Sequence, residues 1–333
     1  MRSSTPALQI PIHQIREAGQ QKTRTQMSDQ VIIYHANCID GSMGALCAYY
    51  AFPKAYFHAA THNKEDDILD NVKDKDVYFI DFCYKEDKTR AICELAKSVV
   101  FLDHHQTSLP YIEKIVDEYS SNKLTLEDVG RTSMKEAVSL DKCKSFCSMD
   151  KSGAMLAYEY FSKARYSINV EVVEMVQDRD LWKWEYPETE AVTSFLYTLP
   201  QFDPTVTQTF LDWHCYAGYS IAELKDLGQP IVKARQKNIE DGCKRAFKAR
   251  MFDKEIYIAN ATDCFSEIAG ELALKGEFGA TFHINSQGKY VYSLRVANGD
   301  LDISVLAETV GGGGHKKAAG CTSELPLHQM IKT

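Results

Sequence analysis

The stretch VVFLDHHQTS, residues 99–108, decides the fold class of this chain. Its first four residues are apolar, which is typical of a strand buried on both faces in a helix-covered parallel sheet. The stretch then changes abruptly to Asp103, His104 and His105. A carboxylate and two imidazoles at the end of a buried strand need charged partners or a metal ion, because burying an unpaired charge is costly. Ligands in open α/β sheets bind at the carboxyl ends of the strands, so we predict a metal site at that edge.

Two upstream segments show the same pattern, an apolar run followed by a carboxylate or an imidazole. Residues 31–34, VIIY, are followed by His35 and Asp40, and residues 77–80, VYFI, are followed by Asp81. A single Asp after a strand is usually a turn residue. Three apolar segments that each end in a carboxylate or an imidazole favour a shared site over three separate turns.

Helices are expected between these strands. Residues 42–50 and 86–97 have helical composition, and a short strand is expected around residues 55–58. The alternation of strands and helices predicts an N-terminal doubly wound parallel sheet in an α/β protein. Residues 152–163 are predicted to form a further amphipathic helix. Residues 120–147 are polar without periodicity, and we interpret them as an insertion or mobile flap with no assigned chemistry.

The 333 residues are enough for two domains, each with its own core. We predict a disordered or targeting tail at 1–28, a catalytic domain at 29–220, a helical linker at 221–250 and a smaller α/β domain at 251–333. The tail holds four basic residues and one acid. That composition is compatible with a mitochondrial transit peptide, although a disordered tail is the preferred interpretation.

The amino-acid composition argues against several classes of binding partner. The net charge of −8 argues against broad binding to long duplex DNA, which needs a basic surface. No apolar run reaches the length of a membrane span, so no membrane association is expected. The ten cysteines are scattered without a CxxC pair, which favours reduced thiols in an intracellular protein, cytoplasmic or mitochondrial. The oligomeric state stays open, and a homodimer is one of the options.

A fourth apolar run, residues 170–176, leads into the acidic segment QDRD at 177–180. Trp182, Trp184 and Tyr186 follow as an aromatic cluster. Such a cluster could belong to the core or serve as a platform for a nucleobase. Of the two interpretations, we prefer the core.

The C-terminal part begins with a predicted strand at 255–259 and a helix at 266–275. Residues 280–285 and 290–296 alternate apolar and polar side chains, as a hairpin does. The segment 311–320, GGGGHKKAAG, comes next. Four consecutive glycines can present several backbone N–H groups to one anion.

Basic residues accompany these glycines. His315 and Lys316 follow directly, and Arg295 on the neighbouring predicted strand offers a bidentate fork for a phosphate. A flexible loop would not need these residues, so we predict a phosphate site here. The residues expected to bind substrate in this part are Arg295, Gly312, Gly313, Gly314, His315 and Ser266.

Taken together, these motifs resemble the DHH phosphoesterases. The motifs that carry the resemblance are DHH at 103–105, H-x-x-C-x-D-G at 35–41, Asp81 and D-x-D at 178–180. The end of the chain is similar to the C-terminal domain associated with that family, through SLR at 293–295, Asp302 and GGGGHKKAAG at 311–320. The resemblance extends from about residue 30 to residue 322.

The resemblance implies a phosphoesterase that uses two divalent cations, usually Mn²⁺, with Mg²⁺ as the alternative. Asp81 is expected to bridge the two ions. His35 is expected to bind one of them, and Asp40 and His104 the other. A carboxylate of the segment 178–180 completes the second set.

The choice between Asp178 and Asp180 is not decided by spacing, and Asp178 is preferred. His105 is expected to face the scissile phosphate, and Asp103 to orient the histidines. One position departs from the family pattern, because Cys38 stands where an Asp is usual. Mn²⁺ and Mg²⁺ favour oxygen ligands and thiolates suit softer ions, so Cys38 either stays outside the ligand set or shifts the metal preference.

The expected substrate is a short single-stranded oligonucleotide or a small nucleotide phosphodiester, cleaved to mononucleotides, with its distal phosphate held by the C-terminal domain. Two alternatives remain. One is an exopolyphosphatase or pyrophosphatase, against which the aromatic residues argue mildly. The other is a catalytically impaired module that only binds nucleotides because its first metal site lacks an Asp.

Overall fold

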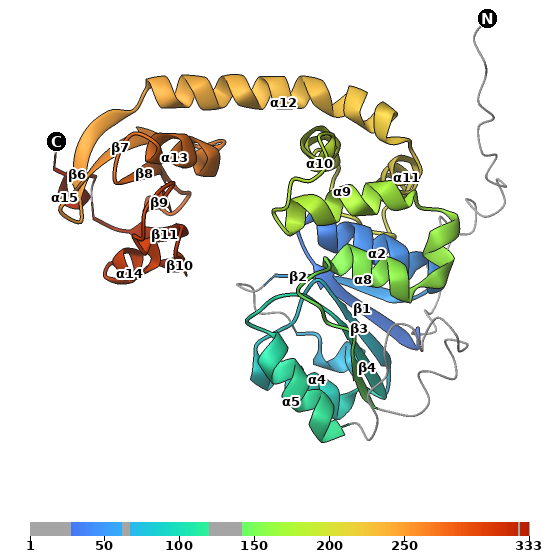
Figure 1. The fold of residues 1–333 in the computed structure, drawn as a ribbon. Coiled ribbons are helices and arrows are strands. Elements are labelled where there is room, and N and C mark those ends of the chain that lie inside the picture. Colours follow the sequence, from blue (N-terminus) through green and yellow to red (C-terminus); the bar gives the residue numbers. More distant parts are fainter. Residues whose placement is uncertain (1–27, 62–66, 120–141, 326, 333) are drawn as a thin grey trace, which may run out of the picture. The chain divides into compact units, whose positions relative to one another are not determined.

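The computed structural model describes residues 28–61, 67–119, 142–325 and 327–332. The chain divides into an N-terminal unit, Met1–Gln229, and a C-terminal unit, Pro230–Thr333 (Figure 1). The division falls inside the long helix α12 (Ile221–Lys244), which contains Pro230. Strand β6 (Phe247–Met251) belongs to the sheet of the C-terminal unit, so the last residues of the predicted linker are already part of that sheet.

The N-terminal unit is built on a five-stranded sheet in which every neighbouring pair is parallel, in the order β2-β1-β3-β4-β5. Its strands are β1 (Gln30–His35), β2 (Tyr56–Ala60), β3 (Asp76–Ile80), β4 (Ser98–Leu102) and β5 (Cys143–Ser145). The predicted fold class is confirmed. The predicted insertion at 120–147 was wrong at its end, because residues 143–145 form the edge strand; residues 120–141 lie outside the described part of the chain.

Helices cover both faces of this sheet (Figure 1). Helices α2 (Ile39–Ala51) and α8 (Gly153–Tyr160) lie on one face, and α4 (Glu86–Leu95) and α5 (Leu109–Tyr119) lie on the other. The short helix α3 (Leu69–Val72) precedes β3. Because both faces are covered, β3 and β4 are buried at every position, which explains their continuous apolar sequence.

The apolar run at 170–176 belongs to a helix, α9 (Val170–Asp180), and not to another strand. Its buried positions Val172, Val173 and Val176 follow helical spacing. Helix α8 is buried along most of its length, so the predicted amphipathic helix is a core helix here. The remaining helical elements of this unit are η1 (Ser162–Tyr166), α10 (Thr189–Leu196) and α11 (Thr207–Tyr216).

The C-terminal unit has a six-stranded mixed sheet in the order β10-β11-β9-β8-β7-β6. Its further strands are β7 (Lys254–Asn260), β8 (Phe278–Ile284), β9 (Tyr290–Arg295), β10 (Gly313–His315) and β11 (Ala318–Ser323). The predicted hairpin is the antiparallel pair β8–β9. The helices are α13 (Phe265–Ala273), which connects the parallel strands β7 and β8, α14 (Ile303–Glu308) and α15 (Leu327–Met330).

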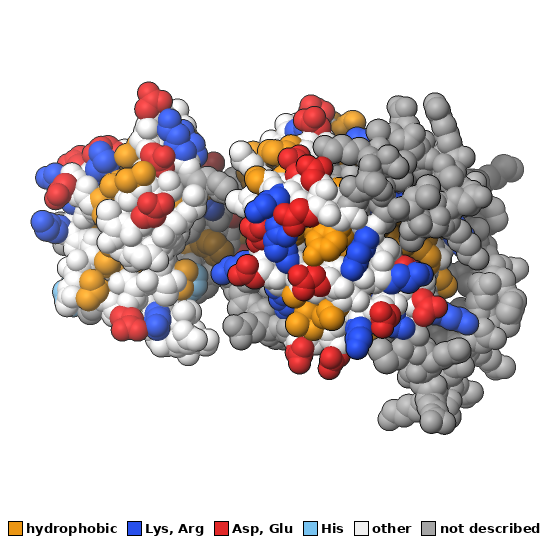
Figure 2. Space-filling view, turned by 90° about the horizontal axis from the view of Figure 1, so that it is seen from below, with side chains coloured by type: hydrophobic (Ala, Val, Ile, Leu, Met, Phe, Trp, Pro, Cys, Tyr) orange, Lys and Arg blue, Asp and Glu red, His pale blue; other side chains and the backbone are white. Residues whose placement is uncertain are grey.

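The surface offers no single dominant charge on the face drawn in Figure 2, where acidic and basic side chains alternate over the described residues. This mixture is not the continuous basic surface that long duplex DNA requires. Within the described ranges, no helix has the length and apolar content needed to cross a bilayer. All ten cysteines are free thiols.

Candidate functional site

Asp81 occupies the centre of the site. It follows β3 directly, and the register pairs Tyr34 with Ile80 and Ile80 with Leu102, so the residues after β1, β3 and β4 meet at one edge of the sheet. The Asp81 backbone has φ of 55°, a left-handed conformation that costs a non-glycine residue about 1–3 kcal/mol. Its side chain is buried, with 1% of the residue exposed.

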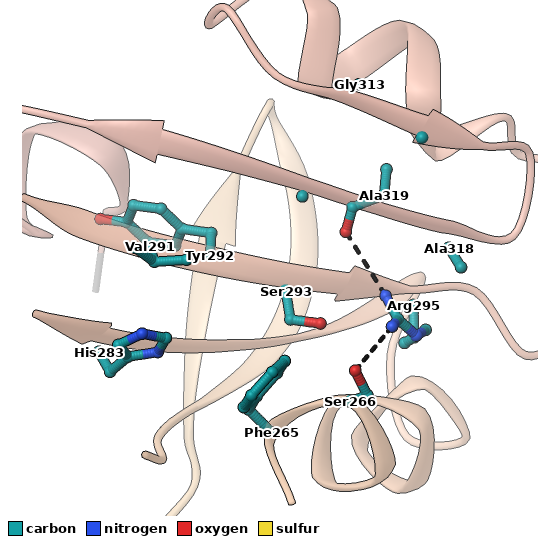
Figure 3. Close-up of a pocket in the computed structure, with 12 residues that line it drawn as sticks. Phe265, Ser266, His283, Val291, Tyr292, Ser293, Arg295, Gly313, Ala318 and Ala319 are labelled. Atoms are coloured by element: carbon teal, nitrogen blue, oxygen red, sulfur yellow. Dashed lines mark hydrogen bonds between the residues drawn. The ribbon is translucent and has the colours of Figure 1, made fainter. Parts of the chain in front are cut away.

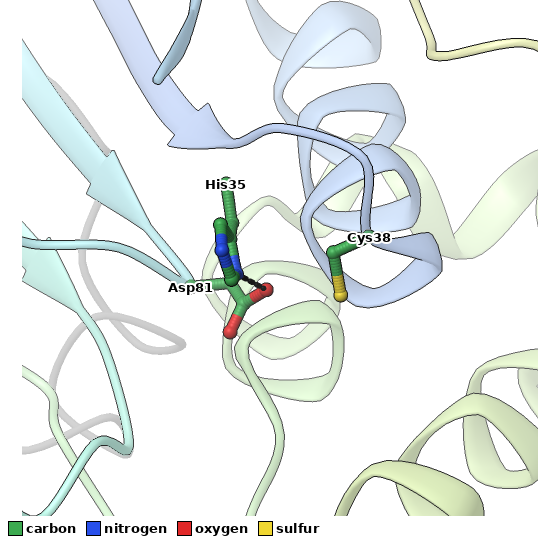
Figure 4. Close-up of side chains that lie close together, drawn as sticks. All are labelled: His35, Cys38 and Asp81. Atoms are coloured by element: carbon green, nitrogen blue, oxygen red, sulfur yellow. Dashed lines mark ion pairs between the residues drawn. The ribbon is translucent and has the colours of Figure 1, made fainter. Parts of the chain in front are cut away.

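Two imidazoles contact the Asp81 carboxylate. His35 Nδ1 lies 3.3 Å from Oδ2 (Figure 4), and His104 Nε2 lies 3.1 Å from Oδ1. The side chain of Cys38 points toward the same group, and one potential ligand atom from each of His35, Cys38 and Asp81 lies within 4.8 Å of the others. The structure therefore brings together the residues predicted for the first metal site.

A second group forms around His104. Its Nε2 lies 3.2 Å from Asp180 Oδ2 and 3.9 Å from Asp40 Oδ2. Asp40 is fully buried in the first turn of α2, and its Oδ1 accepts a hydrogen bond of 3.0 Å from the Ala154 N–H. Its Oδ2 has no hydrogen-bond partner among the described residues. A buried carboxylate oxygen of this kind is costly unless a cation satisfies it.

The carboxylates around His104 lie close together, and their negative charges shift the pKa values of this group. Burial and the charges of Asp81 and Asp180 raise the pKa of Asp40 well above its ordinary value. Burial would lower the pKa of His104, but the Asp81 hydrogen bond and the nearby carboxylates outweigh it and raise this pKa to about 9. Burial would raise the pKa of Asp81, yet its bonds to His104 and His35 hold it below the ordinary value. The His104 imidazolium thus offsets part of the negative charge of these carboxylates.

Asp178 and Asp180 have different surroundings. The Asp178 carboxylate accepts hydrogen bonds from the N–H groups of Glu185 at 2.8 Å and Tyr186 at 3.3 Å, and from the Thr189 hydroxyl at 2.5 Å. Asp180, by contrast, joins Asp40 and His104 in a group whose ligand atoms lie within 4.8 Å of one another. The structure reverses the preference for Asp178, because that carboxylate is already occupied in holding the following loop.

His105 pairs with Asp103, and it also lies in a third group with Asp81 and His104, whose potential ligand atoms are within 4.8 Å of one another. Its Nδ1 lies 2.7 Å from Asp103 Oδ1, and the Ser108 hydroxyl donates to Asp103 Oδ2. The Asp103 hydrogen bond raises the pKa of His105, which favours its charged form. A cavity of about 260 Å³ lies beside this pair, lined by Cys83, Lys85, Glu86, Asp103, His105, Thr107, Ser108 and Tyr111.

Gly153 is a part of the site that the sequence analysis missed. A Cβ atom at this position would lie 2.4 Å from Asp81 Cβ and 2.9 Å from Asp40 Oδ2. Gly153 begins α8 directly after the N-cap Ser152. Only the tertiary arrangement reveals this role, because nothing in the local sequence relates Gly153 to two carboxylates far away in the chain.

The donors fit a pair of divalent cations. Carboxylate and imidazole ligands suit Mn²⁺ and Mg²⁺ or Zn²⁺, and the unsatisfied Asp40 oxygen needs a positive partner. Cys38 adds a soft ligand to the first group. Burial, together with the charges of Asp81 and Asp40, raises the pKa of its thiol, so Cys38 remains protonated until a cation displaces the proton.

The C-terminal unit holds a second candidate site, a pocket of about 270 Å³ against β9, β11 and the start of α13 (Figure 3). Arg295 donates to the Ser266 hydroxyl at 2.7 Å and to the Leu294 carbonyl at 2.9 Å. Burial lowers the pKa of Arg295, which nevertheless stays charged at any physiological pH. Gly313 and Gly314 line the same pocket, whereas Gly312 is not among the lining residues. The side chain of His315 lies outside the described part of the chain.

Backbone amides of the glycine segment already donate hydrogen bonds within the chain, whereas an anion-binding loop needs amides that are free. The N–H of Gly311 donates to Glu308 O, and that of Gly312 donates to Ala307 O at 2.8 Å. Gly313 and Gly314 pair with β11 as strand β10. The prediction was that several of these amides face one anion; the N–H groups of Gly311 and Gly312 are instead satisfied within the chain.

Comparisons with known proteins locate the chain among its relatives. Residues 260–330 match the DHHA1 domain. The chain is 24% identical over 312 residues to an uncharacterized protein, R106, of Acanthamoeba polyphaga mimivirus, covering 87% of this chain and 66% of that protein. It is 24% identical over 265 residues to the oligoribonuclease NrnB of Bacillus subtilis, covering 74% of this chain and 58% of NrnB.

The chain thus spans less than two thirds of the length of these two relatives. Among solved structures, it is similar to the pGpG-specific phosphodiesterase PggH of Vibrio cholerae, with a TM-score of 0.47 and 14% identity over 88% of this chain and 92% of that one. The match to the DHHA1 domain and the sequence similarity to an oligoribonuclease confirm the predicted resemblance. The chain thus carries a DHHA1 domain at residues 260–330 and is similar in sequence to an oligoribonuclease, as its resemblance to the DHH phosphoesterases predicts.

Proposed function

We propose that this protein is a metal-dependent phosphodiesterase that hydrolyses short oligonucleotides or small nucleotide phosphodiesters. The observation that carries this proposal is the meeting of five side chains at the carboxyl edge of the parallel sheet: His35, Asp40, Asp81, His104 and Asp180. Two buried carboxylate oxygens there, Asp40 Oδ2 and Asp81 Oδ2, have no hydrogen-bond partner among the described residues. The similarity to an oligoribonuclease supports the substrate class.

Two divalent cations would be held by the two groups of side chains. His35 and Cys38 would hold the first, and Asp40, His104 and Asp180 the second. Asp81, whose carboxylate contacts both His35 and His104, would contribute to both. When bound, such a pair lowers the pKa of water and offsets the charge of the phosphoryl oxygens. Mn²⁺ is the preferred ion, with Mg²⁺ as the alternative.

The remaining side chains position the phosphate. Asp103 fixes one ring nitrogen of His105 and favours its charged form, so the imidazolium can attract a phosphoryl oxygen. Ser108 in turn fixes Asp103 by donating to its second carboxylate oxygen. In the C-terminal unit, Arg295 with Ser266 would bind the distal phosphate of the substrate, which favours short substrates and chain ends.

The decisive experiment is the Mn²⁺-dependent hydrolysis of the dinucleotide pApA by the whole chain. We expect turnover in the wild type and at least about a thousandfold loss in Asp81→Ala, because that carboxylate belongs to both groups of ligands. Asp76→Ala is the matched control, since Asp76 lies at the opposite end of the same strand and bonds only Ser98 and Lys97 among the described side chains.

The same assay separates the alternatives. Activity on short polyphosphate or pyrophosphate alone would replace the proposal with a polyphosphatase. Binding of pApA without cleavage under Mn²⁺, Mg²⁺ or Zn²⁺ would replace it with a nucleotide-binding module. If Asp81→Ala hydrolysed pApA as fast as the wild type, the assigned catalytic site would be wrong.

A further inference from the structure

The segment after Asp180 exposes aromatic side chains beside the candidate metal centre. Trp182 is 71% exposed, Trp184 37% and Tyr197 45%, whereas Trp213 in the same unit is 1% exposed. The expectation that the cluster at 182–186 belongs to the core is therefore not met. Large aromatic side chains on a surface usually indicate a place where something binds.

These rings form a defined arrangement with one guanidinium. The ring centroids of Trp182 and Trp184 are 5.0 Å apart at an interplanar angle of 78°. Arg179 Cζ lies 5.5 Å from the centroid of Trp184 and 4.9 Å from that of Tyr197. We call Arg179, Trp182, Trp184 and Tyr197 the aromatic platform.

The backbone of this segment is held in place. Trp182 and Trp184 both have left-handed φ angles, 57° and 55°, which bulky residues rarely adopt. The Asp178 carboxylate fixes the loop by accepting the N–H groups of Glu185 and Tyr186. Trp182 ends α9 as a left-handed cap, in which the Lys183 N–H donates to Asp178 O and the Trp182 N–H donates to Arg179 O, so the segment after the helix has a fixed position.

The loop lies directly after a residue of the candidate metal centre. Asp180, whose Oδ2 is 3.2 Å from His104 Nε2, is two residues from Trp182. Tyr197 lies close enough to Cys38 and Asp180 to interact with both electrostatically, so a group next to a phosphate at that centre would meet this side of the platform. Aromatic rings and a stacked guanidinium bind nucleobases through their flat faces, with little preference among bases.

We propose that the aromatic platform stacks a nucleobase of the substrate and thereby selects nucleotides over base-free phosphate chains. This inference rests on the proposed function and identifies the part of the substrate that is recognised next to the scissile phosphate. One stacked base is typically worth about ten- to a hundredfold in affinity.

The test compares pApA with an analogue of the same sugar–phosphate backbone that lacks both bases. We expect the wild type to prefer pApA by about ten- to a hundredfold in kcat/KM. Trp182→Ala should remove most of this preference by lowering kcat/KM for pApA alone, and Trp182→Phe should retain it. Tyr56→Ala is the matched control, because Tyr56 is 42% exposed but begins β2, at the opposite edge of the sheet.

The proposal would be wrong if Trp182→Ala lowered kcat/KM equally for pApA and for the analogue. It would also be wrong if the wild type showed no preference for pApA. Tryptophan fluorescence gives a second reading that does not need turnover. Adding pApA should quench the exposed Trp182 and Trp184 but not the buried Trp213, and Trp182→Phe should reduce the quenching. Quenching without hydrolysis would support the platform while contradicting the proposed activity, whereas hydrolysis without quenching would do the reverse.

Discussion

Cys38 is the single residue on which the choice of metal depends most. Its thiol lies with His35 and Asp81 in the first group of ligands, where the family pattern has an oxygen donor. We predict that Cys38→Asp shifts the preference toward Mn²⁺ and Mg²⁺, because both favour oxygen ligands, and away from Zn²⁺ or Cd²⁺. Activity and affinity measured with each ion would check this. Cys38→Ser is the control that removes the thiolate without adding a charge, and unchanged preferences in both variants would place Cys38 outside the ligand set.

The close packing around Gly153 leads to a prediction about stability and metal binding. A Cβ at 2.4 Å from Asp81 Cβ forces a side chain or the backbone to move. We expect Gly153→Ala to destabilise the protein by about 1–3 kcal/mol and to weaken Mn²⁺ binding at least about tenfold, because both Asp81 and Asp40 would be displaced. Thermal unfolding and metal titration measure the two effects.

The matched control is Gly270→Ala in α13, where an added Cβ meets nothing within 4 Å. Alanine there should be neutral or stabilising by up to about 1 kcal/mol. Equal effects of the two substitutions would show that space next to Asp81 is not limiting.

His104 makes the binding of a metal depend on pH. Its pKa is raised to about 9, so the metal-free protein carries a proton on this imidazole at neutral pH. Coordination requires the neutral ring, and a metal must therefore expel that proton. Mn²⁺ affinity should rise by about tenfold per pH unit between pH 6.5 and 8.5 and level off near pH 9. Calorimetry in two buffers of different ionisation enthalpy would detect the released proton, and an affinity independent of pH would contradict the assignment.

At the scale of elements, the strands were the most readable part of the sequence. Strands β3 and β4 are covered by helices on both faces, so each reads as a continuous apolar run that stops at a polar residue. Strand β5 escaped notice because it has only three residues, CKS, and one of them is the buried Lys144. A short edge strand carries too little apolar sequence to be recognised.

The helix α9 shows what spacing alone does not determine. Asp178 and Asp180 are two positions apart, and on a helix such residues face different directions. One carboxylate holds the following loop and the other faces His104. In the structure one acid of this segment, Asp180, lies in the group around His104, and which of the two does so depends on how the helix is rotated against the sheet.

At the scale of the whole molecule, the proposed function gives the two units different tasks: hydrolysis in the N-terminal unit and binding of the distal phosphate in the C-terminal unit. We predict that Arg295→Ala raises KM for pApA by about ten- to a hundredfold while kcat changes little, since a hydrogen bond to a charged group contributes about 1.5–3 kcal/mol to binding. Steady-state kinetics with pApA and with ApA, which lacks the terminal phosphate, would check this, because only pApA should lose affinity. Arg245→Ala, an exposed arginine of the same unit, is the control, and a fall in kcat at constant KM would contradict the division.

The left-handed backbone of Asp81 also determines how a substrate complex can be captured. Asn and Asp both adopt this left-handed conformation more readily than other non-glycine residues, whereas Ala at this position would destabilise the protein. Asp81→Asn would therefore keep the loop after β3 in its native shape while removing the negative charge of that side chain. Such a variant is the one to crystallise with an uncleaved dinucleotide, because it separates loss of turnover from loss of fold.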